Sequence, residues 1–180
     1  MHVLLDACVA LNLEAAGEFD AIADVLGLTF VMSTKVAEET FYLDDIIDGE
    51  PCRIQIDLGP HIRKGTLGVH NLTPGDETAT FVRLAGQVDD GEAECLALAV
   101  HRALPFATDD RLAIRVAGDL GLTTIFRTAE LLRRYADRAN LRSHDITLML
   151  GAVERRASFR PPRSSPDYSW WLGHSSPSDH

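Results

Sequence analysis

Apolar residues occur in this sequence with two different spacings. Short continuous apolar runs, such as HVLL at residues 2–5, indicate strands that are buried on both faces, and a recurrence at helical spacing, as in residues 7–26, indicates amphipathic helices. Gly17 is expected to divide residues 7–26 into two helices. The predicted strands are residues 2–5, 28–32, 54–56, 66–72, 105–108 and 123–126. The predicted helices are residues 7–26, 34–42, 77–84, 92–102, 111–118, 128–137 and 143–156.

The alternation of strands with helices predicts the fold class. It indicates an α/β protein of three layers, α/β/α, around a central parallel sheet of four to five strands. Because right-handed crossovers bring the carboxyl ends of parallel strands to one edge of the sheet, a functional site is expected at that edge. Residues 44–60 are acidic and contain Gly49 and Pro51, so they predict a loop with only the short strand 54–56 in it.

The length of the chain and its change in composition predict one domain and a tail. With 180 residues, of which 46% are hydrophobic, the chain is long enough for a single core, which we assign to residues 1–158. Residues 159–180 are rich in Pro, Ser, Asp and His, and they predict a tail that is disordered or docked on a partner. Trp170 and Trp171 within it suggest docking against a surface, that of this domain included.

Cysteine spacing and the amino-terminal segment favour a cytoplasmic protein. Cys8, Cys52 and Cys95 form no CxxC pair and no zinc-ligand spacing, and free thiols suit a reducing compartment. The first residues include no basic region, and Asp6 interrupts their apolar stretch, which is untypical of a signal peptide. No apolar run approaches the roughly 20 residues that a membrane span needs.

The charge of the chain is unevenly distributed. A formal net charge of -10 argues against nucleic-acid binding, because the release of counterions needs Lys and Arg. Two features can offset it: acids gathered around divalent cations reverse the local field, and basic residues are concentrated in the last third of the chain. Solvated helix faces account for this concentration equally well. These basic residues are Arg127, Arg133, Arg134, Arg138, Arg142, Arg155, Arg156, Arg160 and Arg163.

Acidic residues stand at four places that a parallel sheet can bring together at one edge. They are Asp6 after the first strand, Glu38 and Glu39 in the helix after the second, Glu92 and Glu94 at the start of an apolar helix, and Asp109 and Asp110 after a late strand. Carboxylates gathered without cations repel and raise each other's pKa. Mg²⁺ or Mn²⁺ would relieve this repulsion, because hard cations prefer carboxylate oxygen, and such a cation can activate water for phosphodiester cleavage.

Each of these acids also has a structural interpretation. Asp and Glu at the start of a helix cap it and interact favourably with its macrodipole. Asp6 is the residue that favours the metal interpretation. It is flanked by apolar residues on both sides, it is costly to bury without a partner, and no cation lies near it in the sequence.

Three polar residues beside the last acid pair have two readings each. Arg111 and Arg115 lie one turn apart after Asp110, so they can contact an RNA phosphate or form ion pairs with nearby acids. Thr108 can bind a metal-bound water or simply end its strand.

Four stretches of the sequence resemble the PIN domain, in the branch with a GEAE-type helix. They are VLLDACVALNL from residue 3, STKVAEETF from residue 33, DDGEAECLALAV from residue 89 and FATDDRLAIRVAGDLGLTTIFRTAELL from residue 106. The resemblance covers about residues 1–155, and the part over residues 88–132 is the most specific.

This resemblance implies an enzyme, a Mg²⁺- or Mn²⁺-dependent ribonuclease similar to VapC-type toxins of toxin–antitoxin pairs. The implied partners are an RNA substrate, a cognate antitoxin protein and, for many members, a second copy of the chain. The positions that match the family's catalytic, metal-binding acids are Asp6, Glu39 (better than Glu38), Glu92 (with Glu94 as its neighbour) and Asp110 (with Asp109 as its neighbour).

The sequence departs from the family in ways that support other hypotheses. Cys8 stands where members often carry a small hydroxyl or amide residue, and Glu92 replaces the commoner Asp. The first alternative is therefore a degenerate PIN-like domain that no longer cleaves and acts as a binding or regulatory partner. The second is a flavodoxin-like receiver or phosphatase domain, which would need a Lys after a late strand, and this sequence has none there.

Overall fold

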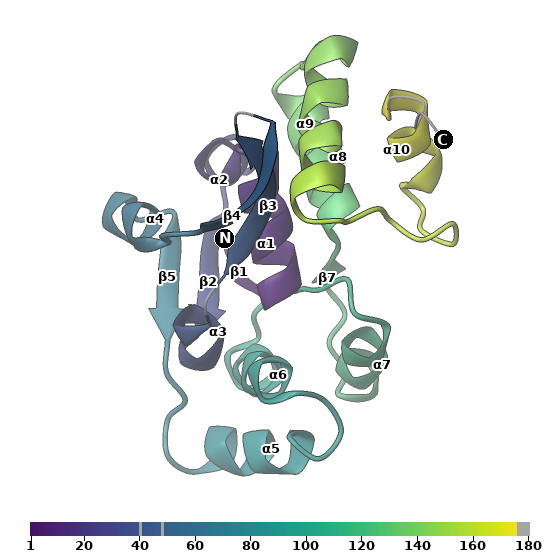
Figure 1. Ribbon diagram of the computed structural model, residues 1–180. Coiled ribbons are helices and arrows are strands. Elements are labelled where there is room, and N and C mark those ends of the chain that lie inside the picture. The colour runs from purple at the N-terminus through teal and green to yellow at the C-terminus, as the bar shows by residue number, and fades with distance from the viewer. Residues whose placement is uncertain (40, 48, 176–180) are drawn as a thin grey trace.

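The computed structural model, which describes residues 1–39, 41–47 and 49–175, has a central sheet in which all five strands run parallel (Figure 1). Their order across the sheet is β5-β2-β1-β6-β7. The strands are β1 (His2–Leu5), β2 (Thr29–Ser33), β5 (Leu67–His70), β6 (Phe106–Ala107) and β7 (Ile125–Phe126). The predicted fold class, a three-layer α/β/α protein with a parallel sheet of four to five strands, is confirmed.

Helices cover both faces of this sheet. On one side α1 packs against α8 and α9 and α2 packs against α8, and on the other α6 crosses β1, β2 and β6, with α5 and α7 beside it (Figure 1). None of the helices in the described ranges has both the length and the apolarity to cross a membrane. The helices are α1 (Ala7–Ala16), α2 (Phe19–Leu26), α3 (Thr34–Glu38), α4 (Gly59–Lys64), α5 (Asp76–Leu84), α6 (Asp90–Arg102), α7 (Arg111–Asp119), α8 (Thr128–Arg138), α9 (Ser143–Arg156) and α10 (Tyr168–His174).

The strand order reverses next to β1. The chain adds β2 and β5 on one side of β1 and then returns to the other side with β6, where Leu5 pairs with Ala107. In open α/β sheets, ligands bind outside the carboxyl ends of the strands at such a reversal. The residues that follow β1 and β6 therefore occupy the position in this fold that is best suited to a site.

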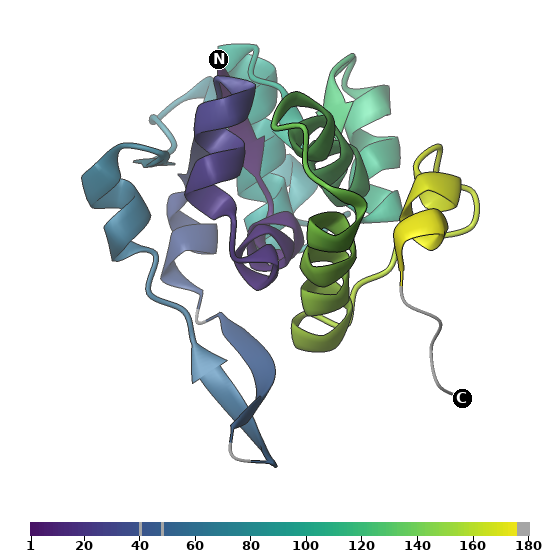
Figure 2. The same cartoon turned by 90° about the horizontal axis from the view of Figure 1, so that it is seen from above.

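The interpretation of residues 44–60 as a loop is wrong. β3 (Tyr42–Ile47) and β4 (Glu50–Gln55) form an antiparallel hairpin outside the main sheet, and it projects from the body of the molecule (Figure 2). Gly49 lies between the strands with a φ of 85°, a left-handed conformation that glycine adopts without strain. The hairpin is held by inward-facing Leu43, which is 3% exposed, and a short helix, α4, follows it.

The helix that was expected to reach Tyr42 ends four residues earlier. α3 begins after Ser33, whose side chain accepts a hydrogen bond from the Val36 N–H, and it ends at Glu38. Glu39 then has an extended backbone, with φ -66° and ψ 145°. The β-hairpin that starts just downstream takes up the chain that the helix would have used.

The carboxyl-terminal helix α10 lies against α8 and α9. Trp171 is fully buried, and its indole N–H donates a hydrogen bond of 2.7 Å to Glu154 Oε1 on α9. The tryptophan pair therefore docks on this domain itself through Trp171. The predicted tail spans residues 159–180, and its last part, 176–180, lies outside the described residues.

Candidate functional site

Asp6 lies directly after β1, at the point where the strand order reverses. Its N–H donates to Ala107 O of β6 at 3.0 Å, and its Oδ1 accepts a 2.7 Å bond from the Val9 N–H, which caps α1. The residue is only 3% exposed. Burial raises the pKa of the Asp6 carboxyl to about 7. Hydrogen bonds from Thr108 and Val9 oppose this rise, and the charges of Asp109 and Asp110 add to it.

The two acids after β6 have different surroundings. Asp110 caps α7, since its Oδ1 accepts from the N–H groups of Leu112 and Ala113 at 2.7 and 2.8 Å. Asp109 faces inward, where its Oδ2 lies 3.5 Å from Nδ2 of Asn12, a buried side chain of α1. Burial raises the pKa of Asp109, and hydrogen bonds from Thr128 are the largest opposing effect.

The two glutamates near the start of α6 point in different directions. Asp89 caps the helix, and its Oδ1 accepts a 2.8 Å bond from the Glu92 N–H. The Glu92 side chain lines the same hollow as Asp6. Glu94 is turned away and accepts a 2.7 Å bond from the Lys35 N–H at the start of α3. Of the two candidates for the third acid, Glu92 is therefore the one that faces Asp6.

Glu39 is the acid of the α3 region that reaches this hollow. A Cβ atom added at Gly91 would lie 2.9 Å from Glu39 Oε1, so the carboxylate rests on the amino-terminal end of α6. Burial raises the pKa of Glu39, and the charge of Asp89 adds to the effect. Glu38 is exposed and does not line the hollow.

The resulting acidic hollow is small, about 50 Å³. None of the described residues that line it is Lys, Arg or His. Burial raises the pKa of Glu92 to about 7, with further contributions from Asp89, Asp110 and Asp6. Uncompensated carboxylates in one hollow are the situation that a hard cation relieves. The residues that line it are Asp6, Ala7, Cys8, Val36, Glu39, Asp89, Gly91 and Glu92.

Cys8 shares this surface. Burial raises the pKa of its thiol to about 12, and the largest added effect comes from the charge of Asp6. The thiol therefore stays protonated at neutral pH. It can accept or donate only a weak hydrogen bond where a hydroxyl or amide would make a strong one.

The four predicted acids are not all brought to the same place. Asp6, Glu39 and Glu92 share the acidic hollow, whereas Asp110 does not line it and influences Asp6 and Glu92 through its charge. Within residues 1–39, 41–47 and 49–175, no group of three or more His, Cys, Asp or Glu side chains stands ready to hold a metal ion. The acids thus face one region without forming a closed set of ligands.

The two arginines expected near a phosphate lie on the surface of α7. Arg111 and Arg115 are both exposed. Neither forms an ion pair with another described residue, so the ion-pair reading of these side chains finds no support in the described part of the chain. Both are free to contact an anionic ligand beside Asp110.

Two residues of this region, Asp89 and Asn12, were not predicted from the sequence to lie near the site. Asp89 reads in the sequence as a helix cap, and its position in the hollow depends on the packing of α6 against α3. Asn12 lies on a helix where no acid or cation neighbours it in sequence, yet its Nδ2 also donates to Thr128 Oγ1 at 3.0 Å and so joins α1 to α8. Both placements come from contacts between segments far apart in the chain.

Comparison with protein-family models, with curated proteins and with solved structures finds no match for this chain.

Proposed function

We propose that this protein is a metal-dependent endoribonuclease of the PIN-like kind, in which Asp6, Glu39, Glu92 and Asp110 hold Mg²⁺ or Mn²⁺. The observation that carries the proposal is the position of the acids. They come from four separate segments. Asp6, Glu39 and Glu92 share the acidic hollow at the carboxyl end of β1, where the strand order reverses, and Asp110 after β6 acts on Asp6 and Glu92 through its charge.

The donor set fits a hard divalent cation. Every ligand candidate is a carboxylate, the chemistry that Mg²⁺ and Mn²⁺ prefer over nitrogen or sulfur. The acidic hollow also lacks a Lys, Arg or His among its described lining residues, so a bound cation would neutralise the negative charge of its carboxylates. Asp6 would be the innermost ligand, since it is buried and held in place by its hydrogen bond to Val9.

A bound divalent cation supplies an activated water and a positive charge for the phosphate of the scissile bond. The chain's own residues would position the metal-binding acids and neutralise the charge of the RNA phosphates. The Thr108 hydroxyl hydrogen bonds to the Asp6 carboxylate, and its Oγ1 accepts a 3.1 Å bond from the Asp110 N–H. Thr108 thus fixes the position of Asp110 relative to Asp6. Arg111 and Arg115, exposed on α7, would bind phosphates of the RNA backbone beside the acids.

The biological role that we propose is that of a toxin neutralised by a cognate antitoxin protein. The support is the resemblance of residues 88–132 to the GEAE-type branch of the PIN domain, together with a three-layer fold that such a domain requires. The same resemblance is the reason to propose RNA rather than DNA as the substrate.

Two observations favour a second function, a degenerate domain that binds a partner without cleaving. The described residues contain no ready group of three ligands, and Cys8 occupies the hollow where a stronger hydrogen-bonding side chain would orient Asp6. In that case Asp6 and Asp110 remain for their structural roles as helix caps.

Calorimetric titration with Mn²⁺, combined with an RNA cleavage assay, tests the proposal. Asp6→Asn removes the charge and keeps a side chain that caps helices well. Under the proposal the wild type binds Mn²⁺ and cleaves, and the Asp6→Asn and Glu39→Gln variants do neither. Glu38→Gln is the matched control, because Glu38 neighbours Glu39 but lies outside the hollow. A wild type that binds no metal and cleaves no RNA would contradict the nuclease proposal and favour the second function, partner binding without cleavage.

A further inference from the structure

His61 on α4 lies between two carboxylates from different helices. Its Nδ1 is 2.8 Å from Asp20 Oδ1 on α2, and its Nε2 is 2.7 Å from Glu14 Oε1 on α1. The imidazole also packs on Phe19, with 4.5 Å between the ring centroids. The His61 side chain is only 16% exposed, so water replaces few of these contacts. The contacts hold α4, which follows the hairpin in the chain, against α1 and α2.

This arrangement needs one proton more than a neutral imidazole supplies. A neutral imidazole has one N–H donor and one lone pair, whereas two ionised carboxylates that face both ring nitrogens need two donors. The additional proton is therefore held by His61 or by Glu14. Burial raises the pKa of the Glu14 carboxyl, and the neighbouring His61 is the largest opposing effect. Because histidine is the side chain that ordinarily changes charge between about pH 5 and 8, this is the pH range in which to look for loss of the proton.

The other charges around His61 favour Asp20 over Glu14 as the partner that stays bound. Lys64 lies 3.4 Å from Asp20 Oδ2, and the Thr66 hydroxyl donates to Asp20 as well. After loss of the proton, the remaining N–H can stay on Asp20, and Glu14 then faces a lone pair. The titratable and charged groups around His61 are Glu14 of α1, Glu18 at the start of α2, Asp20 and Asp24 of α2, Lys64 of α4 and, acting on Glu14, Arg156 of α9.

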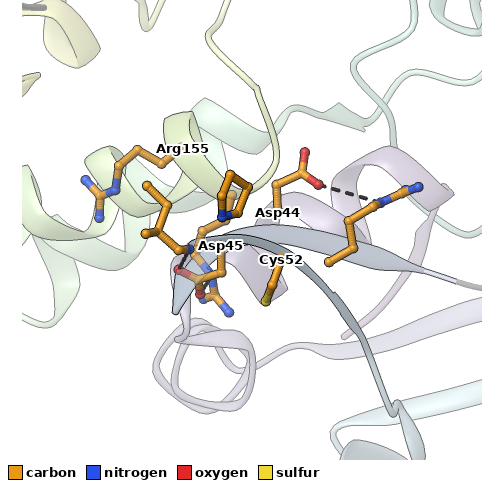
Figure 3. A pocket seen from close by; sticks show the side chains of 8 residues that line it. Asp44, Asp45, Cys52 and Arg155 are labelled. Carbon is orange, nitrogen blue, oxygen red and sulfur yellow. Dashed lines mark hydrogen bonds and ion pairs between the residues drawn. The ribbon is translucent and has the colours of Figure 1, made fainter. Parts of the chain in front are cut away.

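Arg156 in the last turn of α9 fastens the hairpin to the body of the protein. Its Nε lies 3.1 Å from Asp45 Oδ2 on β3, and its Nη1 donates a 3.2 Å hydrogen bond to Ala15 O on α1. Figure 3 shows the hollow, of about 700 Å³, that Asp45 and Arg156 line between the hairpin and the end of α9. Arg156 thus connects three segments, α1, α9 and β3.

Glu14 and Asp45 are competitors for the Arg156 guanidinium. Glu14 directly precedes Ala15, to which Arg156 is bonded, and the charge of Arg156 lowers the pKa of Glu14. Glu14 Oε1 and Arg156 Nε are both buried atoms, and neither makes an aligned hydrogen bond within the described part of the chain. The present partner of each atom is therefore close but replaceable.

We infer that a proton in the His61 cluster controls the attachment of the β3–β4 hairpin to the body of the protein. With the proton present, Glu14 is held by His61, and Arg156 is left to pair with Asp45. When the proton leaves to solvent, Glu14 is released and draws Arg156 away from Asp45, so that β3 separates from α9. Because the attached state binds the additional proton, a rise in pH favours the detached state. The inference does not depend on the proposed nuclease activity, since none of these residues lines the acidic hollow.

Amide hydrogen exchange of the full chain at several pH values tests this control. The readout is the protection of β3, which is the exchange rate relative to that of an unstructured peptide at the same pH. We expect this protection to fall as the pH rises from about 5 to 8, by at most about tenfold per pH unit, the limit for one linked proton.

Three variants separate the switch from a merely structural role. Glu14→Gln should keep the protection of β3 high at every pH, because a neutral amide does not draw Arg156 away. His61→Phe should keep it low at every pH, because the new ring can still pack on Phe19 but binds no proton. His101→Gln is the matched control and should behave as the wild type does, because His101 is exposed on α6 and lies outside the cluster.

Other outcomes overturn the inference. They are a wild-type protection that does not change with pH, a Glu14→Gln variant that keeps the wild-type fall, and a His101→Gln variant that loses it. Circular dichroism checks that each variant is folded. The wild type also supplies a test that needs no variant, since the ¹⁵N chemical shifts of the His61 ring should change with the same midpoint as the protection of β3. Different midpoints would separate the proton from the hairpin and overturn the inference as well.

Discussion

Glu94 accepts a hydrogen bond of 2.7 Å from the backbone N–H of Lys35, which precedes it by 59 residues. This contact ties the buried carboxylate of α6 to the first turn of α3, where helix N–H groups have no partner within their own helix. Two residues earlier, Glu92 points into the acidic hollow and repels its neighbours. Two glutamates in the same turn region thus have opposite effects on the fold.

Substitution separates these two effects. Glu94→Ala should lower the free energy of unfolding by about 1–3 kcal/mol, because the part-buried hydrogen bond from the Lys35 N–H to this carboxylate is lost. Glu92→Ala should leave it unchanged or raise it at neutral pH, because the repulsion with Asp6 and Asp89 is removed. Urea unfolding at pH 7.5 without metal measures both. An equal loss of stability in the two variants would contradict the assignment.

The raised pKa of Asp6 predicts a fall in stability with rising pH. The folded protein holds this proton up to about pH 7, whereas the ordinary pKa of an Asp side chain is 3.8, so the unfolded chain releases it at a lower pH. Between those values the native state binds more protons, and the free energy of unfolding decreases as the pH rises. Asp6→Asn should abolish this part of the decrease.

The measurement for Asp6 is the difference between the two unfolding curves at several pH values. Wild type minus Asp6→Asn should become more negative from about pH 4 to about pH 7 and then level off. Added Mn²⁺ should stabilise the wild type above pH 7 and leave the variant unaffected. A difference that stays constant over this range would show that burial does not shift the carboxyl as described.

The part-buried pair of Glu77 and Arg102 predicts a stability change of the opposite sign. Arg102 Nε lies 2.8 Å from Glu77 Oε1, and the guanidinium holds the pKa of Glu77 down at about 2. This contribution to stability is complete above the ordinary Glu pKa of 4.5 and is lost as the pH falls through about 2. Arg102→Ala should cost about 1–3 kcal/mol at neutral pH, because it leaves the Glu77 carboxylate without its cation while the hydrogen bond from the Thr73 N–H remains.

Thermal and urea unfolding of matched variants checks this pair. Arg83→Ala on the exposed side of α5 is the control and should change little. The double variant Glu77→Gln/Arg102→Met should be less destabilised than Arg102→Ala, because no unpaired charge remains. A double variant that is worse than the single one would mean that the two side chains do not act as a pair.

Trp171 should hold α10 on the domain. Its side chain is fully buried and bonded to Glu154, so Trp171→Ala is expected to cost about 3–5 kcal/mol of docking free energy. Trp170 is half-buried, and Trp170→Ala should cost less. Limited proteolysis followed by mass spectrometry reports the release of the helix. Cleavage of the Trp171→Ala variant within residues 159–175 is expected, and equal resistance of both variants would rule out the docking role.

The sheet and its helices were predictable because the pattern of apolar side chains in these segments matches the secondary structure that they form. The strand at residues 2–5 is apolar and fully buried from Val3 onwards, and the helix that starts near Glu92 has small and apolar residues that fit a buried element. The position of Asp6 at the end of a strand followed from the same run. In such segments, local sequence and tertiary packing favour one conformation.

The hairpin and the carboxyl-terminal helix were not predictable for the opposite reason. Strand β4 contains Glu50, Pro51 and Arg53, which are poor strand formers, and it is held by its pairing with β3 and by inward-facing Ile54. α10 has only seven residues, too few to be stable alone, and depends on the burial of Trp171. Tertiary contacts decide both elements.

The choice among paired acids was only partly visible in the sequence. Glu39 was preferred over Glu38 from its spacing to Val36, and it does reach the acidic hollow. Whether Glu92 or Glu94 faces Asp6 depends on where α3 lies against α6, which no local pattern encodes. The capping bonds of Asp110 are likewise a property of the folded helix α7.

Three of the acids, Asp6, Asp89 and Asp110, each begin a helix and accept hydrogen bonds from its first N–H groups. Natural selection for a stable fold alone would therefore keep a capping residue at these positions, and Asn, Ser or Thr would serve almost as well as Asp. Under the proposed nuclease function, selection for cleavage would accept only the carboxylate at Asp6 and Asp110, the two of these caps that are proposed metal ligands. If the proposed function holds, a library that randomises Asp6 and Asp110, sorted once for folded protein and once for toxicity to the host cell, should yield two different sets of survivors. The breadth of the first set then measures how many side chains can cap these two helices without a carboxylate.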